Sequence, residues 1–64
     1  MNNRDRLIEL LSDYELERRE VAELLKVKAA LVNHWLSSHE SNNYQEMPDM
    51  AIELLEIKLG VKKT

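Results

Sequence analysis

The chain has 64 residues, with one glycine, one proline and no cysteine. A chain of this length forms one domain, residues 1–64, and buries only about 60% of its unfolded surface, so a deep catalytic pocket is not expected. The lack of cysteine excludes disulfides, zinc–thiolate sites and thiol nucleophiles. No apolar run approaches the roughly 18 residues that span a bilayer, and the first residues lead into no signal-peptide core. We therefore expect a cytoplasmic protein without a membrane partner.

Charge is distributed unevenly along the chain. Nine Lys and Arg against twelve Asp and Glu give a net charge of -3, which on average disfavours nucleic acid as a partner. Residues 18–39, however, contain four basic and two acidic side chains together with both histidines. Residues 1–17 and 40–64 are each net acidic. By charge, the middle third alone suits a polyanionic ligand.

The composition predicts an all-α fold. Eleven leucines and many Glu and Lys favour helices, and no stretch has the alternation of β-branched residues expected of a strand. The first helix is expected over residues 4–14, with Asn2 or Asn3 as its N-cap. Spacings of three and four give this helix an apolar side that comprises Leu7, Leu10, Leu11 and Tyr14.

Two short helices are predicted next, over residues 18–25 and 28–38. Only a tight turn at Lys26 and Val27 separates them, so they must cross at a steep angle and pack on something longer. Their buried sides are expected to comprise Val21, Ala22, Leu24, Leu25, Leu31, Val32, Trp35 and Leu36.

A polar loop over residues 37–46 precedes the fourth predicted helix, which has Pro48 in its first turn and Gly60 at its end. This helix has two apolar sides that lie roughly opposite each other. A domain of this size can cover only one of them. The first side comprises Ile52, Leu55 and Leu59, beside Ala51, and the second comprises Met50, Leu54, Ile57 and Val61.

Residues 18–36 resemble the helix-turn-helix motif of the lambda-repressor-like family, which includes Cro and the phage repressors. That family has Val-Ala and then Leu in the first motif helix, an apolar residue after the turn, and a β-branched residue followed by an aromatic one in the second helix. Here Ala22 is small where the two helices touch, and Val27 plugs the turn into the core. Val32 and Trp35 anchor the second motif helix and leave its far side free.

The resemblance resumes at Met47-Pro48 and continues over residues 52–61, so it covers most of the chain. The chain departs from the family at Lys26, which replaces the usual turn glycine, and at Glu17 and Lys28, which replace capping residues. The link over residues 37–47 is also longer than usual. Either Lys26 adopts a left-handed backbone with modest strain, or the turn differs from that of the family.

The resemblance implies a four-helix domain whose motif, about residues 18–37, places its second helix in the major groove of DNA. Asn33 is the expected base reader, because its amide both donates and accepts and pairs well with adenine. Arg18 and Arg19 are expected to contact phosphates. Because phosphate contacts do not depend on base sequence, Arg18→Ala is expected to weaken binding to all duplexes alike. Tyr44 either reaches the sugar-phosphate backbone or folds back on the core. The predicted DNA-binding residues are Arg18, Arg19, Lys28, Ala29, Ala30, Asn33, His34, Ser37 and Tyr44.

The resemblance also places the first apolar side of the last helix against the core, which leaves the second side uncovered. An exposed apolar surface of this kind normally marks an association surface. We therefore expect a two-fold homodimer that holds its recognition helices about 34 Å apart on a palindromic operator. The alternative is a monomer in which the long loop folds over this side. The predicted dimer interface comprises Met50, Leu54, Ile57 and Val61.

These features predict a sequence-specific transcriptional regulator, most simply a dimeric repressor or autorepressor of a phage, prophage or mobile-element operon. No nucleophile with its base is evident, and His34 and His39 lack further ligands, so no enzyme activity, metal, cofactor or small-molecule substrate is expected. One alternative is an excisionase-like architectural DNA-binding factor, which requires a β-hairpin wing. The other is an acidic helical protein-binding module, such as an anti-repressor or a phage-encoded inhibitor.

Overall fold

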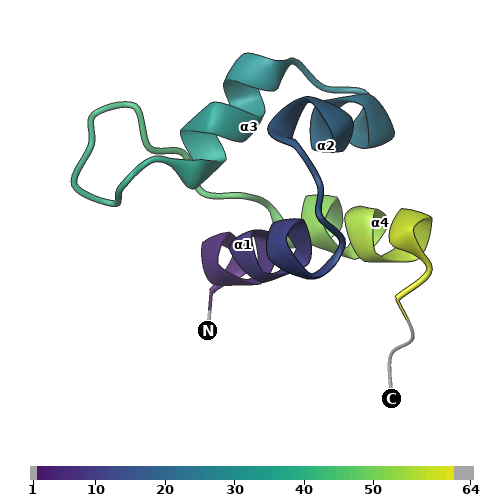
Figure 1. The fold of residues 1–64 in the computed structure, drawn as a ribbon. Coiled ribbons are helices and arrows are strands. Elements are labelled where there is room, and N and C mark those ends of the chain that lie inside the picture. Colours follow the sequence, from purple (N-terminus) through teal and green to yellow (C-terminus); the bar gives the residue numbers. More distant parts are fainter. Residues whose placement is uncertain (1, 62–64) are drawn as a thin grey trace.

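A computed structural model, which describes residues 2–61, contains four helices and, over those residues, no strand. The helices are α1 (Asn3–Asp13), α2 (Arg18–Leu25), α3 (Ala29–Leu36) and α4 (Asp49–Leu59). In Figure 1, α1 and α4 lie in one layer, and α2 and α3 form a second layer above it. The predicted all-α class is confirmed. None of the four helices is long and apolar enough to cross a membrane.

The helix ends follow from local chemistry. The side chain of Asn2 caps α1 by accepting from the backbone N–H of Asp5 at 2.8 Å. Pro48 precedes α4, and Gly60 ends it in the left-handed region, at a φ of 73°. The predicted bounds of α2 are confirmed, whereas α3 is shorter at both ends than expected.

One buried apolar cluster joins all four helices. Trp35 is 3% exposed, and Val32 is fully buried. The expectation that the side of α4 formed by Ile52, Leu55 and Leu59 faces the core is confirmed. The prediction for Tyr14 is wrong, since α1 ends at Asp13 and Tyr14 is 43% exposed. The fully or almost fully buried residues are Leu7, Leu10, Val21, Ala22, Leu25, Val32, Trp35, Met47, Ile52 and Leu55.

The turn between α2 and α3 has the left-handed backbone that its position required. Lys26 lies at φ 57° and ψ 45°. The N–H of Val27 donates to the carbonyl of Ala22 at 3.0 Å, which closes the end of α2 and brings the half-buried Val27 onto the core. A side chain with a Cβ is strained in this region, so Lys26 reverses the chain at an energetic cost.

Polar contacts from α1 and the following loop hold the far end of α3. The Arg4 guanidinium donates from Nε to the carbonyl of Ser37 at 3.0 Å and from Nη2 to the carbonyl of Leu36 at 3.3 Å. The backbone N–H of Gln45 donates to the carbonyl of His34 at 3.1 Å. These donors satisfy carbonyls that a helix end leaves open, and the guanidinium complements the helix dipole. The C-terminal end of α3 is thereby fixed.

Replacing Lys26 with glycine is expected to stabilise the fold by about 0.5–1 kcal/mol, because glycine adopts the left-handed backbone without steric cost. Urea unfolding followed by the fluorescence of Trp35 measures the change. Glu23→Gly, at an exposed position inside α2, is the control and should destabilise by about 1 kcal/mol. Equal losses in the two variants would contradict strain at Lys26.

Replacing Arg4 with methionine is expected to destabilise the fold by about 1 kcal/mol, because it leaves two partly shielded carbonyls without their charged donor. Hydrogen exchange should also speed up at the amides in the last turn of α3. Arg19→Met is the matched control, since Arg19 is exposed and contacts only Glu17, and its effect should stay below about 0.5 kcal/mol. Unchanged exchange at Trp35 and Leu36 would show that Arg4 does not hold this end.

Candidate nucleic-acid interface

Helix α3 presents a small, uncharged outer surface. Val32 and Trp35 point into the core, as predicted, while Ala29, Ala30 and Asn33 are exposed. The two alanines lie in the first turn and leave the backbone approachable. Asn33 is the exposed amide nearest the middle of the helix. The outer side therefore combines close approach with one group that both donates and accepts.

Two residues predicted to point outward are only half exposed. His34 and Ser37 are both of intermediate burial. Helical periodicity does not give the direction of the Ser37 side chain, because α3 ends at Leu36 and the backbone of Ser37 is extended. Its hydroxyl donates to the carbonyl of Asn33 at 2.9 Å, so it completes the helix end. His34 and Ser37 are therefore less accessible than Ala29, Ala30 and Asn33, which form the exposed surface.

Basic side chains flank this surface on the α2 side. Lys28 is exposed and directly precedes α3. Arg18 opens α2, and its Nη1 donates to Oδ1 of Asn33 at 3.0 Å, so the start of α2 lies against the middle of α3. Arg19 is exposed and pairs with Glu17 at 2.8 Å. The structure thus joins Arg18 to Asn33 and places Lys28 directly before α3, while a carboxylate partly neutralises Arg19.

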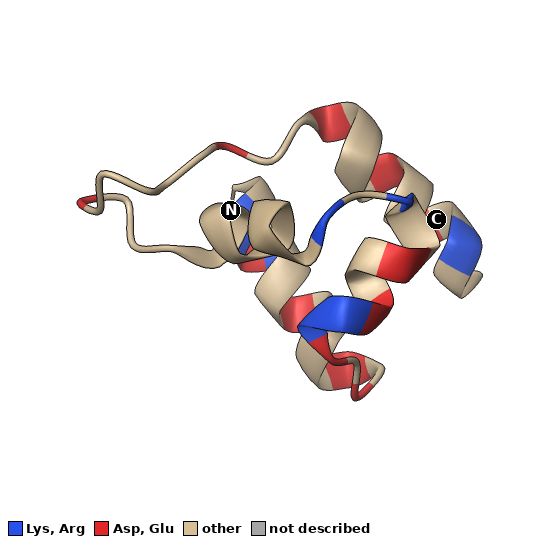
Figure 2. Ribbon diagram, turned by 90° about the horizontal axis from the view of Figure 1, so that it is seen from above, with Lys and Arg blue, Asp and Glu red and all other residues tan. Residues whose placement is uncertain are grey.

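The distribution of charged residues over the structure matches their uneven distribution along the sequence. Figure 2 shows basic segments at the start of α2 and in the turn before α3, with acidic segments spread over α1, α2 and α4. Helix α3 itself contains no Lys, Arg, Asp or Glu. The absence of carboxylates from this helix matters, because each would repel a phosphate backbone.

The loop between α3 and α4 projects beyond the end of α3 (Figure 1). Serine hydroxyls at positions 38 and 41 accept from backbone N–H groups two residues further on and shape its turns. Tyr44 is half-buried, and its ring meets that of His39 edge to face, with centroids 4.5 Å apart. Tyr44 therefore packs within the loop, next to the end of α3.

The outer side of α4 is largely uncovered. Met50 is 81% exposed, Ile57 69% and Leu54 40%. Val61 differs from the prediction, because it is half-buried and packs against the core. Three of the four predicted interface residues, Met50, Leu54 and Ile57, therefore form the exposed apolar surface, which we call the α4 outer face.

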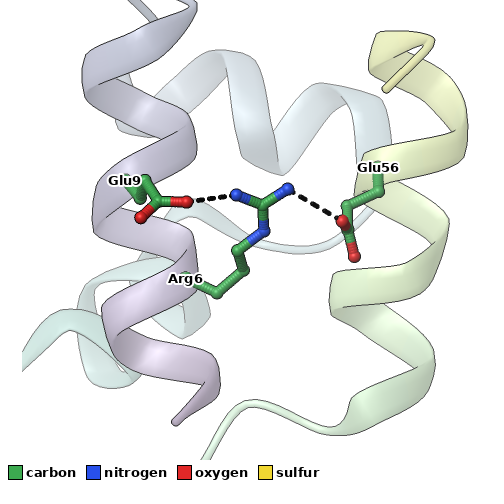
Figure 3. Close-up of polar contacts among 3 residues, drawn as sticks. All are labelled: Arg6, Glu9 and Glu56. Carbon is green, nitrogen blue, oxygen red and sulfur yellow. Dashed lines mark hydrogen bonds and ion pairs between the residues drawn. The ribbon is translucent and has the colours of Figure 1, made fainter. Parts of the chain in front are cut away.

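An ionic bridge fixes the orientation of this face. The Arg6 side chain of α1 lies between Glu9 and Glu56, and its Nη2 is 3.0 Å from Oε2 of Glu56 (Figure 3). The hydrogen bond that Arg6 donates to Glu56 raises the pKa of Arg6, and the one that it donates to Glu9 makes a smaller contribution. The ion pair between Arg6 and Glu56 thus ties α4 to α1 and opposes rotation of α4 about its own axis.

Over the part of the chain that the structure describes, no pocket is present and no three His, Cys, Asp or Glu side chains gather as a metal site would require. The exposed surfaces just described are thus the candidate sites for partners. Comparison with protein-family models, with curated proteins and with solved structures found no significant match to this chain.

Proposed function

We propose that this protein is a small sequence-specific DNA-binding regulator that inserts α3 into the major groove. The observation that carries the proposal is the orientation of α3. Val32 and Trp35 hold one side in the core, while Ala29, Ala30 and Asn33 face outward. A major groove about 12 Å wide admits a helix whose outer side chains are this small.

Electrostatics supports the same assignment. Lys28 and Arg18 lie beside the outer side of α3 and suit the two phosphate backbones that border a groove. The small number of basic groups predicts a moderate dependence of affinity on salt, since each phosphate contact releases counterions.

Such a protein acts by occupying DNA at or near a promoter. A bound domain would exclude polymerase from the DNA that it covers. We therefore propose repression of its own or a neighbouring promoter, in a phage, prophage or mobile-element operon. A wing-dependent architectural role is less favoured, because residues 2–61 contain no strand from which a β-hairpin wing would form.

The α4 outer face supports a two-fold dimer. Its three apolar residues are exposed on a helix that an ion pair ties to α1. An isologous interface uses the same surface on both copies, so one such face is sufficient. A dimer would present two copies of α3 to a palindrome with half-sites about 34 Å apart.

A protein-binding role is the second candidate. The net charge of -3 and the apolar α4 outer face are also the features of an acidic adaptor that docks on a basic, partly apolar partner. DNA binding distinguishes the two candidates, because an adaptor of this kind would bind no duplex.

DNA binding is tested by band-shift and anisotropy assays with the duplex that flanks the gene and with a randomised duplex library. Asn33→Ala should weaken binding to the preferred site by about 1–3 kcal/mol and relax base preference at one position. Lys28→Ala should weaken all duplexes alike and reduce the slope of log affinity against log salt by about 1. Asn42→Ala, in the exposed loop, is the control. A wild-type protein that binds no duplex would contradict the proposal.

Dimerisation is tested by sedimentation equilibrium, in which the wild type should sediment at twice the 7.5 kDa of the chain. Ile57→Glu should yield monomers, because it places a charge in the apolar interface. Ile8→Glu makes the same change at an exposed position on α1 and should leave the dimer intact. Wild-type protein that stays monomeric at micromolar concentration would overturn the dimer.

A further inference from the structure

The side chains of Arg18 and Asn33 join the start of α2 to the middle of α3. The two residues are 15 positions apart in the sequence, and the contact runs from the Arg18 Nη1 donor to the Asn33 Oδ1 acceptor at 3.0 Å. Sequence reasoning gave these residues separate tasks, with Arg18 at phosphates and Asn33 at bases. The hydrogen bond instead couples the two side chains, so that Arg18 affects the orientation of the Asn33 amide.

The chemistry of the pair determines which way the amide of Asn33 faces. A guanidinium only donates hydrogen bonds, whereas an asparagine amide has one accepting oxygen and one donating NH₂ group. Arg18 can therefore hold Asn33 only by its oxygen. In this arrangement Oδ1 lies toward α2 and the NH₂ group is directed away from Arg18.

We propose, on the basis of the proposed DNA-binding function, that Arg18 is a specificity-determining positioning residue that makes Asn33 select adenine over guanine. The fixed NH₂ group donates to N7 of a purine, and the second lone pair of Oδ1 accepts from the N6 amino group of adenine. Guanine presents O6 in place of that amino group, so the fixed amide oxygen would face another acceptor.

An asparagine released from Arg18 loses this discrimination. It can turn its NH₂ group toward both O6 and N7 of guanine while its oxygen faces water. The bond to Arg18 opposes this rotation, because turning the amide replaces an acceptor with a donor in front of the guanidinium. Arg18 thus acts on base choice through Asn33 while its charge still favours phosphates.

The neighbouring arginine supplies a matched control. Arg19 has the same charge and also lies in the first turn of α2, but it pairs with Glu17. Arg18→Ala and Arg19→Ala therefore remove equal charge, and only Arg18→Ala frees Asn33. Both positions are exposed, so both variants should fold, which circular dichroism and Trp35 fluorescence check.

The experiment begins with selection of bound duplexes from a randomised library by the wild-type protein. The position read by Asn33 is the one at which Asn33→Ala abolishes preference. Affinities for duplexes with adenine or guanine there are then measured for each variant at one salt concentration. Arg18→Ala should reduce the adenine-to-guanine affinity ratio about tenfold, whereas Arg19→Ala should lower both affinities and keep the ratio. In an Asn33→Ala background, Arg18→Ala should leave the ratio unchanged.

The outcomes separate the two proposals. Failure of the wild type to enrich any duplex overturns DNA binding, and the role of Arg18 falls with it. Enrichment with a preference other than adenine at the Asn33 position overturns the role of Arg18 alone, as does an equal ratio in the Arg18→Ala and Arg19→Ala variants. A measurement without DNA is also available. The side-chain amide resonances of Asn33 should shift in Arg18→Ala and not in Arg19→Ala, and unchanged resonances in both variants would overturn the contact.

Discussion

The insertion of Trp35 and Val32 into the core is the contact on which the rest of the structure depends. Both side chains lie on the inner side of α3, and both are almost fully buried. A helix of eight residues has little stability of its own, so packing against α2 and the longer helices determines whether it forms and how it faces. Any role of the outer side of α3 follows from this burial.

Polar side chains of α1 form contacts to α3 and α4 that add to the packing of the small core. Arg4 holds the end of α3, Arg6 holds α4, and Asn3 bonds the residues that lead into α4. A domain this small gains little from apolar burial, and charged hydrogen bonds between elements supply additional restraint. The first helix thus contributes to the positions of α3 and of the α4 outer face.

Sequence patterns predicted those features that arise from local chemistry and periodicity. The bounds of α2 and the inward Val32 and Trp35 each depend on residues a few positions apart, whereas the sequence left open whether Lys26 is left-handed or the turn differs. The patterns could not show where α3 stops, because its end is fixed by Arg4, 33 positions from Ser37. For the same reason His34 and Ser37 were expected to be more exposed than they are. The bond from Arg18 to Asn33 joins two elements and has no local signal, so the combined unit could not be inferred.

The hydrogen bonds of Asn2 and Asn3 have a practical consequence for fusion proteins. Asn2 caps α1, and the amide of Asn3 donates to the carbonyl of Met47 at 2.8 Å and to Oδ1 of Asp49 at 2.7 Å. A reporter or purification tag attached at the amino terminus would therefore press on the junction between the first and last helices. Residues 42–43, at the exposed outer part of the loop, make a better insertion point, because chain added there would leave this junction undisturbed.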